Sequence, residues 1–336
     1  MQPACQLSLN QKPARNEFHS QPQPNHPTTL YLQMKTIFIA LSLIIPSFAQ
    51  GPDVSIFEQS RNGMRAEEKR IGKQAEKLCE DGKLLGIEAT GELIKSPAPV
   101  QLELPASQKK PLTPTEIAKR AKASSYRVGW AYLCNSCDNW HIHLAGGYAL
   151  TSDGVLGTCA HVIKTDNKKM RKGGLIAVDQ SGKVYPVTSI LANDTKIDGA
   201  LIKIDTKTTP LPLNDQVAPG DAAFCFSRPL KQGQYFSRGM VNRFYWNSDQ
   251  RGDDPTSVKA LGALKLNVST RWAPGSSGSA VLDTFGNVIG HVATISTMGN
   301  SGNRKDTDKG RTLITLHSAT PARAMMALAR LAEDSD

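Results

Sequence analysis

The 336-residue sequence has few aromatic residues and little that would suit a membrane or a nucleic acid. Phe, Trp and Tyr make up 6% of it, and the apolar run over 36–45 is too short to span a bilayer. The net charge of +10 is compatible with affinity for an acidic surface or a cell-wall polymer, but its spread over the chain favours a solvated basic surface. No arginine-rich helix and no alternation of basic with aromatic residues is present, so no nucleic-acid partner is expected. The many Gly, Pro, Thr and Ser residues instead favour short strands joined by turns.

The beginning of the sequence indicates a compartment. Met34 and Lys35 precede the apolar run, and Ser47 and Ala49 are small residues at the −3 and −1 positions of a cut after Ala49. This pattern predicts a signal peptide over 34–49 and an exported protein, periplasmic or secreted, without stable membrane insertion once the peptide is removed. A retained signal anchor is the competing interpretation. Residues 1–33 are polar and without periodicity, and we interpret them as a misassigned or disordered extension before the true start at Met34.

Residues 50–111 differ in composition from the rest of the chain. The segment 60–82 is rich in Arg, Lys, Glu and Ala, which favour a helix, and 96–111 is rich in proline, as linkers are. This helical and linker region is either a surface helix with its tether or a pro-segment or partner-binding arm. The sequence leaves both interpretations open.

The remaining segment, 112–336, reads as one domain built of strands. Thr113, Pro114 and Glu116 form a capping box that predicts a helix to about residue 123, and 321–333 predicts a C-terminal helix packed on the second group of strands. The predicted strands fall into two groups of about six. They are 126–133, 141–144, 147–151, 155–158, 175–178, 184–190 and 200–204, then 222–227, 235–243, 260–267, 280–283, 288–295 and 312–316.

Three short segments carry residue types that work together in nucleophilic catalysis. Ser277 lies in a Gly-x-Ser-Gly loop that begins at Gly275, where glycines allow tight turns and let successive N–H groups converge. A serine hydroxyl needs an imidazole to accept its proton, and the imidazole needs a carboxylate to orient it. His161 ends a Thr-Cys-Ala-His segment, and Asp198 opens an apolar strand. Together these residues predict an activated serine.

These segments resemble the trypsin/chymotrypsin-like serine peptidases, especially the compact bacterial secreted and periplasmic branch, over roughly residues 120–320. The resemblance implies an all-β fold of two six-stranded antiparallel β-barrels, with a helical N-terminal region and a C-terminal helix. It also implies a serine endopeptidase that cleaves proteins or peptides through an acyl-enzyme intermediate. The catalytic residues would be His161, Asp198 and Ser277, and the backbone N–H groups of Gly275 and Ser277 would form the oxyanion hole. No metal and no cofactor is implied, and the oligomeric state stays open.

The resemblance also suggests which residues bind the substrate. Arg271 lies six residues before the serine, at the base of the family's primary pocket, where an aspartate would select basic side chains. Cleavage after Lys or Arg is therefore not expected; an arginine could favour an acidic side chain, or turn outward into a salt bridge. Ala293, Thr294 and Ile295 correspond to the strand that lines the pocket, and Ile295 replaces a small glycine there.

Export would make the cysteines candidates for disulfides. For Cys134 and Cys137 we favour a local disulfide; a zinc site with His141 or His143 is a second interpretation, although its spacing matches no closed zinc template. A thioredoxin-like redox motif lacks its βαβ setting. Two more cysteines, at 159 and 225, lie in apolar strands and could be buried thiols or a second bridge.

Two other classes of protein fit the same residues. One is a catalytically silent binding protein with a protease fold. The other is an esterase that uses the same triad, although the chain order Ser, Asp, His of α/β-hydrolases is not met.

Overall fold

The computed structural model describes residues 60–97, 101–165, 168–247, 254, 257–299 and 312–330. The predicted extension over 1–33 and the predicted signal peptide over 34–49 lie outside these residues. None of the helices in the described ranges is long and apolar enough to cross a membrane.

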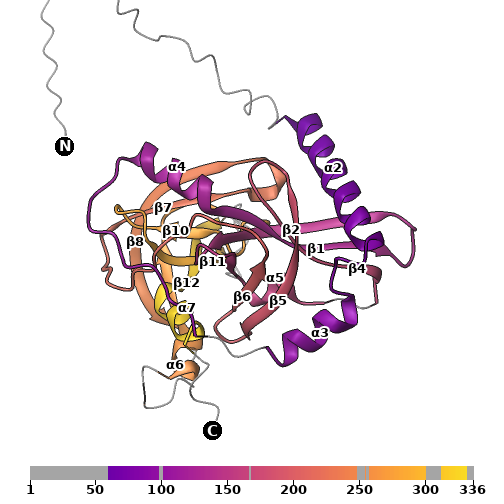
Figure 1. The fold of residues 1–336 in the computed structure, drawn as a ribbon. Coiled ribbons are helices and arrows are strands. Elements are labelled where there is room, and N and C mark those ends of the chain that lie inside the picture. The colour runs from indigo at the N-terminus through magenta and orange to yellow at the C-terminus, as the bar shows by residue number, and fades with distance from the viewer. Residues whose placement is uncertain are drawn as a thin grey trace, which may run out of the picture. The chain divides into compact units, whose positions relative to one another are not determined.

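The first half of the described chain forms a closed antiparallel barrel with the strand order β1-β2-β3-β6-β5-β4 (Figure 1). The strands are β1 (Ser125–Cys134), β2 (Trp140–Ala149), β3 (Val155–Thr158), β4 (Met170–Val178), β5 (Val184–Asp194) and β6 (Gly199–Ile204), and the short helix α5 (Ala160–Ile163) follows β3. The segments 141–144 and 147–151, which we predicted as two strands, form a single strand through Ala149 because β2 stays paired with β1 across Ala145 and Gly146.

The second half forms another closed barrel, with the order β10-β11-β12-β9-β8-β7. Its strands are β7 (Ala222–Ser227), β8 (Tyr235–Trp246), β9 (Leu264–Val268), β10 (Ala280–Leu282), β11 (Val288–Gly299) and β12 (Thr312–Pro321); the 3-10 turn η1 (Pro229–Lys231) follows β7, and helix α6 (Val258–Ala263) precedes β9. The predicted strand 260–267 is therefore partly wrong: the hydroxyl of Ser257 accepts a hydrogen bond from the Ala260 N–H and caps a helix there. The predicted fold of two six-stranded barrels is confirmed.

Helix α4 (Pro114–Ser124) packs against β7 and β10 of the second barrel, and helix α7 (Ala322–Leu328) packs against strands of both barrels. The predicted capping box is present, since Thr113 and Glu116 exchange hydrogen bonds between side chain and backbone. The C-terminal helix packs on β11 and β12 of the second barrel, as predicted. It also contacts the first barrel: Met325 and Leu328 approach Gly199 of β6 so closely that a Cβ there would lie 2.8 Å and 2.7 Å from them.

The segment before the barrels includes two helices, α2 (Arg61–Glu80) and α3 (Ile87–Lys95), which lie against the first barrel (Figure 1). Ile71 and Ala75 of α2 are completely buried against β1, β4 and β5. The following extended segment is tied to the second barrel, because Gln108 and Asn287 exchange two hydrogen bonds. In the described part of the chain, the region before the domain is therefore packed onto it.

All five cysteines in the described ranges have free thiols, so the disulfide predicted between Cys134 and Cys137 is absent. Each sulfur has another partner: Cys134 Sγ lies 3.2 Å from Ser136 Oγ, and Cys137 Sγ lies 3.0 Å from Nε2 of His141. Cys159 and Cys225 are buried thiols, which decides between the two interpretations left open for them.

Candidate active site

His161 and Asp198 meet because β3 pairs with β6. The antiparallel register joins Thr158 to Ala200, so the residues just beyond the end of β3 face those just before β6. His161 Nδ1 lies 3.0 Å from both carboxylate oxygens of Asp198, and the His161 backbone N–H donates to Oδ1 at 3.1 Å. Asp198 has a φ of 60°, a left-handed conformation that aspartate tolerates better than most residues. The carboxylate is thus held by both the ring and the backbone of the histidine.

This contact shifts the pKa of both groups. The hydrogen bond that His161 donates to Asp198 raises the pKa of His161 above its ordinary value, against the opposing effect of burial. Burial alone would raise the pKa of Asp198, but the hydrogen bonds and the charge of His161 outweigh it, and that pKa lies below its ordinary value. At neutral pH Asp198 is therefore an anion that favours a proton on Nδ1, which leaves Nε2 as the basic nitrogen of His161.

The loop that carries Ser277 connects β9 with β10 and lies against the segment that leads to His161. The Gly278 N–H donates to the carbonyl of Val292 at 2.8 Å, and the Ser277 carbonyl accepts from the Gly146 N–H at 2.6 Å. A Cβ on Gly278 would lie 2.5 Å from Thr158 Oγ1, so the two segments are in direct contact. Among the described residues the Ser277 hydroxyl has no hydrogen bond to His161, as is common in catalytic sites without substrate.

Burial distinguishes Ser277 from its neighbours. Ser276 is completely buried and its hydroxyl has no hydrogen-bond partner among the described residues, while Ser279 is 5% exposed. Ser277 is the partly exposed serine of the three. A substrate could therefore reach the Ser277 hydroxyl, which is the one that the Gly-x-Ser-Gly register favours.

Two backbone N–H groups of the loop are available to a ligand. The N–H groups of Ser276, Gly278 and Ser279 all donate to backbone carbonyls. Those of Gly275 and Ser277 make no such bond within the described part of the chain. Gly275 has a φ of 97°, which favours glycine and turns the peptide units of the loop. An oxyanion would fit two such unpaired donors.

The residues predicted to bind substrate lie on this loop and on β11. Arg271 is held by its backbone, which exchanges hydrogen bonds with the hydroxyl of Ser237, and its side chain is exposed. Ala293 is buried, whereas Thr294 and Ile295 are exposed on β11. The structure therefore places Arg271, Thr294 and Ile295 on the accessible surface near the serine loop, whereas Ala293 is not accessible there.

Two further residues hold these parts together: Trp272, which the sequence did not single out, and His291, a histidine for which the sequence suggested a structural role. Trp272 is buried, donates from Nε1 to the Thr294 carbonyl at 3.1 Å and packs edge-on against His317 at 5.0 Å. His291 is completely buried on β11 and donates from Nε2 to the Asp198 carbonyl at 3.0 Å. No local pattern marks Trp272, and only the contacts between distant segments reveal what either residue holds in place.

The family comparison bears on this arrangement. Residues 146–290 match the family model of the trypsin-like peptidase domain. The chain contains a trypsin-like peptidase domain. The matched range holds His161, Asp198 and Ser277, and strands on either side of it complete both barrels. No curated protein matches the chain. A trypsin-like peptidase domain supports a protease, a class of hydrolase that acts on proteins.

Proposed function

We propose that this protein is an exported serine endopeptidase that cleaves peptide bonds through an acyl-enzyme intermediate. The observation that carries the proposal is the double hydrogen bond between His161 Nδ1 and the Asp198 carboxylate, on a segment that the Ser277 loop contacts. The alternatives, a catalytically silent binding protein and an esterase, become outcomes of the test below.

In the first half of the reaction, His161 Nε2 accepts the proton of the Ser277 hydroxyl while Oγ attacks the carbonyl carbon of the substrate. A tetrahedral oxyanion forms, and Asp198 stabilises the imidazolium. The C–N bond then breaks, and the proton on Nε2 goes to the leaving amine. The new amino terminus departs, and the acyl group stays on Ser277 as an ester.

In the second half, water replaces the amine. His161 accepts a proton from the water as its oxygen attacks the ester, and returns the proton to Ser277 Oγ when the acyl group leaves as a carboxylic acid. The N–H groups of Gly275 and Ser277 stabilise the oxyanion in both halves; a donor of this kind is worth about 2.7–4 kcal/mol in acyl-transfer enzymes.

Substrate selection rests on the residues beside the serine loop. Arg271 is the only charged residue of the four proposed to bind substrate, with Ala293, Thr294 and Ile295, and its side chain is exposed. We therefore infer a preference for an acidic side chain. Cleavage of a peptide library by wild type and Arg271→Ala would test this: an unchanged preference in the variant would contradict the role of Arg271.

Labelling with a fluorophosphonate probe tests the catalytic residues. Wild type should be labelled, Ser277→Ala and His161→Ala should not, and Ser276→Ala is the matched control because its buried hydroxyl lies one residue away. Absence of labelling in wild type would indicate the silent binding protein. Labelling with turnover of esters but not of peptides would indicate the esterase.

Export is supported by the signal-peptide pattern over 34–49. N-terminal sequencing of protein recovered from outside the cytoplasm should begin at Gln50. A mature chain that still holds residues before Met34 would contradict the proposed start. A mature chain that begins near residue 112 would indicate instead that residues 50–111 act as a pro-segment.

A further inference from the structure

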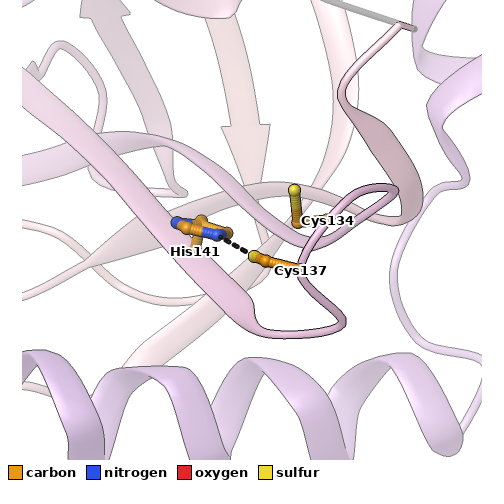
Figure 2. A group of neighbouring side chains, drawn as sticks. All are labelled: Cys134, Cys137 and His141. Atoms are coloured by element: carbon orange, nitrogen blue, oxygen red, sulfur yellow. Dashed lines mark hydrogen bonds between the residues drawn. The ribbon is translucent and has the colours of Figure 1, made fainter.

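Two cysteines and a histidine gather at the tip of the hairpin formed by β1 and β2. Cys134 is the last residue of β1, Cys137 lies in the turn, and His141 is the second residue of β2. Their sulfur atoms and one ring nitrogen all lie within 4.8 Å of one another. Figure 2 shows the Cys137 sulfur pointing to the His141 ring, with Cys134 beside them at the base of the turn.

This cluster is separate from the proposed active site. His141 and Gly146, which contacts the Ser277 loop, are both on β2. They are five residues apart on the strand, and at about 3.4 Å per residue this separates them by about 17 Å. The cysteine pair therefore has no place in the peptidase mechanism.

The spacing of the three atoms suits a tetrahedral metal ion. In a zinc site with Zn–S bonds of about 2.3 Å, neighbouring ligand atoms lie about 3.8 Å apart. No two of the three ligand atoms lie more than 4.8 Å apart, and Cys137 Sγ lies 3.0 Å from His141 Nε2. The separation expected around a zinc ion falls between these two distances. Small side-chain rotations would bring the three atoms to the required separation.

The turn holds both sulfur atoms among hydrogen-bond donors. The Ser136 N–H donates to Cys134 Sγ at 3.4 Å, and Ser136 Oγ lies 3.2 Å from the same sulfur. Donors directed at sulfur favour the thiolate, which is the form that binds metals.

Contacts outside the cluster fix the shape of the turn. The Cys134 N–H donates to the Asn139 carbonyl at 3.0 Å, and the Asn135 N–H donates to the backbone carbonyl of Lys169, beside β4, at 3.0 Å. Asp138 adopts a φ of 54° and forms an ion pair with Arg171 of β4 at 2.5 Å. The ligand-bearing turn is thus tied to the barrel independently of any ion.

Stacking orients the histidine. The His141 ring lies on Tyr132 of β1, with ring centroids 5.6 Å apart and an angle of 23° between the planes. This places Nε2 toward Cys137. A neutral imidazole with its proton on Nδ1 would offer the Nε2 lone pair to a metal.

We propose that Cys134, Cys137 and His141 bind one zinc ion, as two thiolates and an imidazole, with the fourth position open to water or to a donor from outside the chain. Two soft sulfur ligands with one imidazole favour zinc over magnesium or calcium. Cys137 is exposed, which gives the ion a way in. Binding displaces the protons of the two thiols and changes no oxidation state. The proposal departs from the local disulfide that the sequence favours, and a disulfide between these two cysteines would exclude it.

The test uses the full chain with Ser277→Ala, so that the result does not depend on peptidase activity and no self-cleavage occurs. After treatment with a chelator under reducing conditions, Co²⁺ is added as a spectroscopic probe and then displaced with Zn²⁺. We expect one equivalent of Co²⁺ to give the visible bands of tetrahedral cobalt and a near-ultraviolet band from thiolate ligands. Zinc should abolish both and raise the Tm.

Variants identify the ligands. Cys137→Ser, at an exposed position that should not disturb folding, and His141→Asn should each weaken Co²⁺ binding at least about tenfold, the loss typical of a disturbed metal site. Cys79→Ser removes a thiol from α2 and should bind normally. His161→Ala should also bind normally, which would exclude Cys159, His161 and Asp198, a second close group of metal-ligating residue types within the described ranges, as the metal site.

Three results would overturn the proposal. One is the absence of thiolate bands at saturating Co²⁺ in reduced, folded protein. Another is binding that survives Cys137→Ser but is lost in His161→Ala. The third is protein that, isolated without added reductant or chelator, has a disulfide between Cys134 and Cys137 and no bound zinc, as shown by intact mass and thiol titration.

Discussion

Replacement of Glu67 by glutamine should destabilise the protein more than any other single charge removal on α2. Glu67 Oε1 lies 3.0 Å from Arg127 Nη2 on β1, and Oε2 lies 3.2 Å from Arg228 Nη1 just after β7. One carboxylate therefore neutralises guanidinium groups from both barrels. The side chains of Glu67, Arg127 and Arg228 are 17%, 14% and 18% exposed, so solvent screens their charges only weakly.

The expected loss follows from what remains in the variant. Burial, and then the nearby Arg228, lower the pKa of Arg127 to about 10, and Glu67 opposes this shift. Without the carboxylate, two buried cations face each other. Breaking a buried ion pair costs about 3–5 kcal/mol, and the residual exposure favours the lower end, about 3 kcal/mol. That is a large part of the 5–15 kcal/mol by which a typical domain is stable.

Urea unfolding, followed by tryptophan fluorescence in the Ser277→Ala background, measures this loss. With a slope of about 3 kcal/mol per molar urea, the midpoint should fall by about 1 M. Glu80→Gln is the matched control, because Glu80 is an exposed carboxylate on the same helix. If the two variants unfold within about 0.5 kcal/mol of each other, the change expected of an ordinary surface substitution, the bridging role of Glu67 is refuted.

Three further predictions concern the active site. Asp198→Asn should lower kcat by about 10⁴-fold. Because Asp198 raises the pKa of His161, and the imidazole must be neutral to act as the base, the acid limb of the pH profile of kcat/KM should lie above pH 6.5 in wild type and move to lower pH in the variant. An unmoved limb would contradict the contact between Asp198 and His161. Burial lowers the pKa of His291 to about 4, so the unfolded chain binds more protons than the folded one between about pH 6.5 and pH 4. The free energy of unfolding of wild type should therefore fall by about 3 kcal/mol as the pH falls through this window. His291→Gln should lose correspondingly less, and equal slopes of unfolding free energy against pH would show the reasoning wrong. Gly278→Ala should unfold at least about 1–3 kcal/mol more easily and lose activity, because φ is 79° and the Cβ would lie 2.5 Å from Thr158 Oγ1. Gly182→Ala, with φ of 84° in open space, is the control for backbone strain alone, and an equal cost in both would mean that the clash is unimportant.

The predicted strands and the observed barrels differ where long-range contacts override local signals. Gly146 looked like a break between two strands, yet β2 continues through it. A Cβ at this position would lie 2.6 Å from the Ser279 backbone nitrogen, so the glycine lets the serine loop of the second barrel approach the first. A glycine needed for close approach cannot be distinguished from a turn glycine by its sequence neighbours.

The cysteine pair shows the same limit on a smaller scale. The spacing of Cys134 and Cys137 permits a disulfide or a metal site equally well. The position of His141 on the paired strand, stacked on Tyr132, gives the Cys137 sulfur a different partner. Strand register fixes that contact, and a shift of one residue would turn the histidine to the other face of the sheet.

The sequence by itself determined the kinds of chemical group, their chain order and the elements that carry them. The alternation of apolar residues predicts the strands, Thr113 and Glu116 predict a helix start, and the flanks of His161, Asp198 and Ser277 mark the catalytic candidates, because all of these signals depend on residues near one another in the chain. The tertiary structure decided which distant groups meet. Contact between the two barrels brings His291 to the Asp198 carbonyl across 93 residues, and the packing of α2 brings Glu67 to Arg228 across 161, and no local pattern encodes either contact.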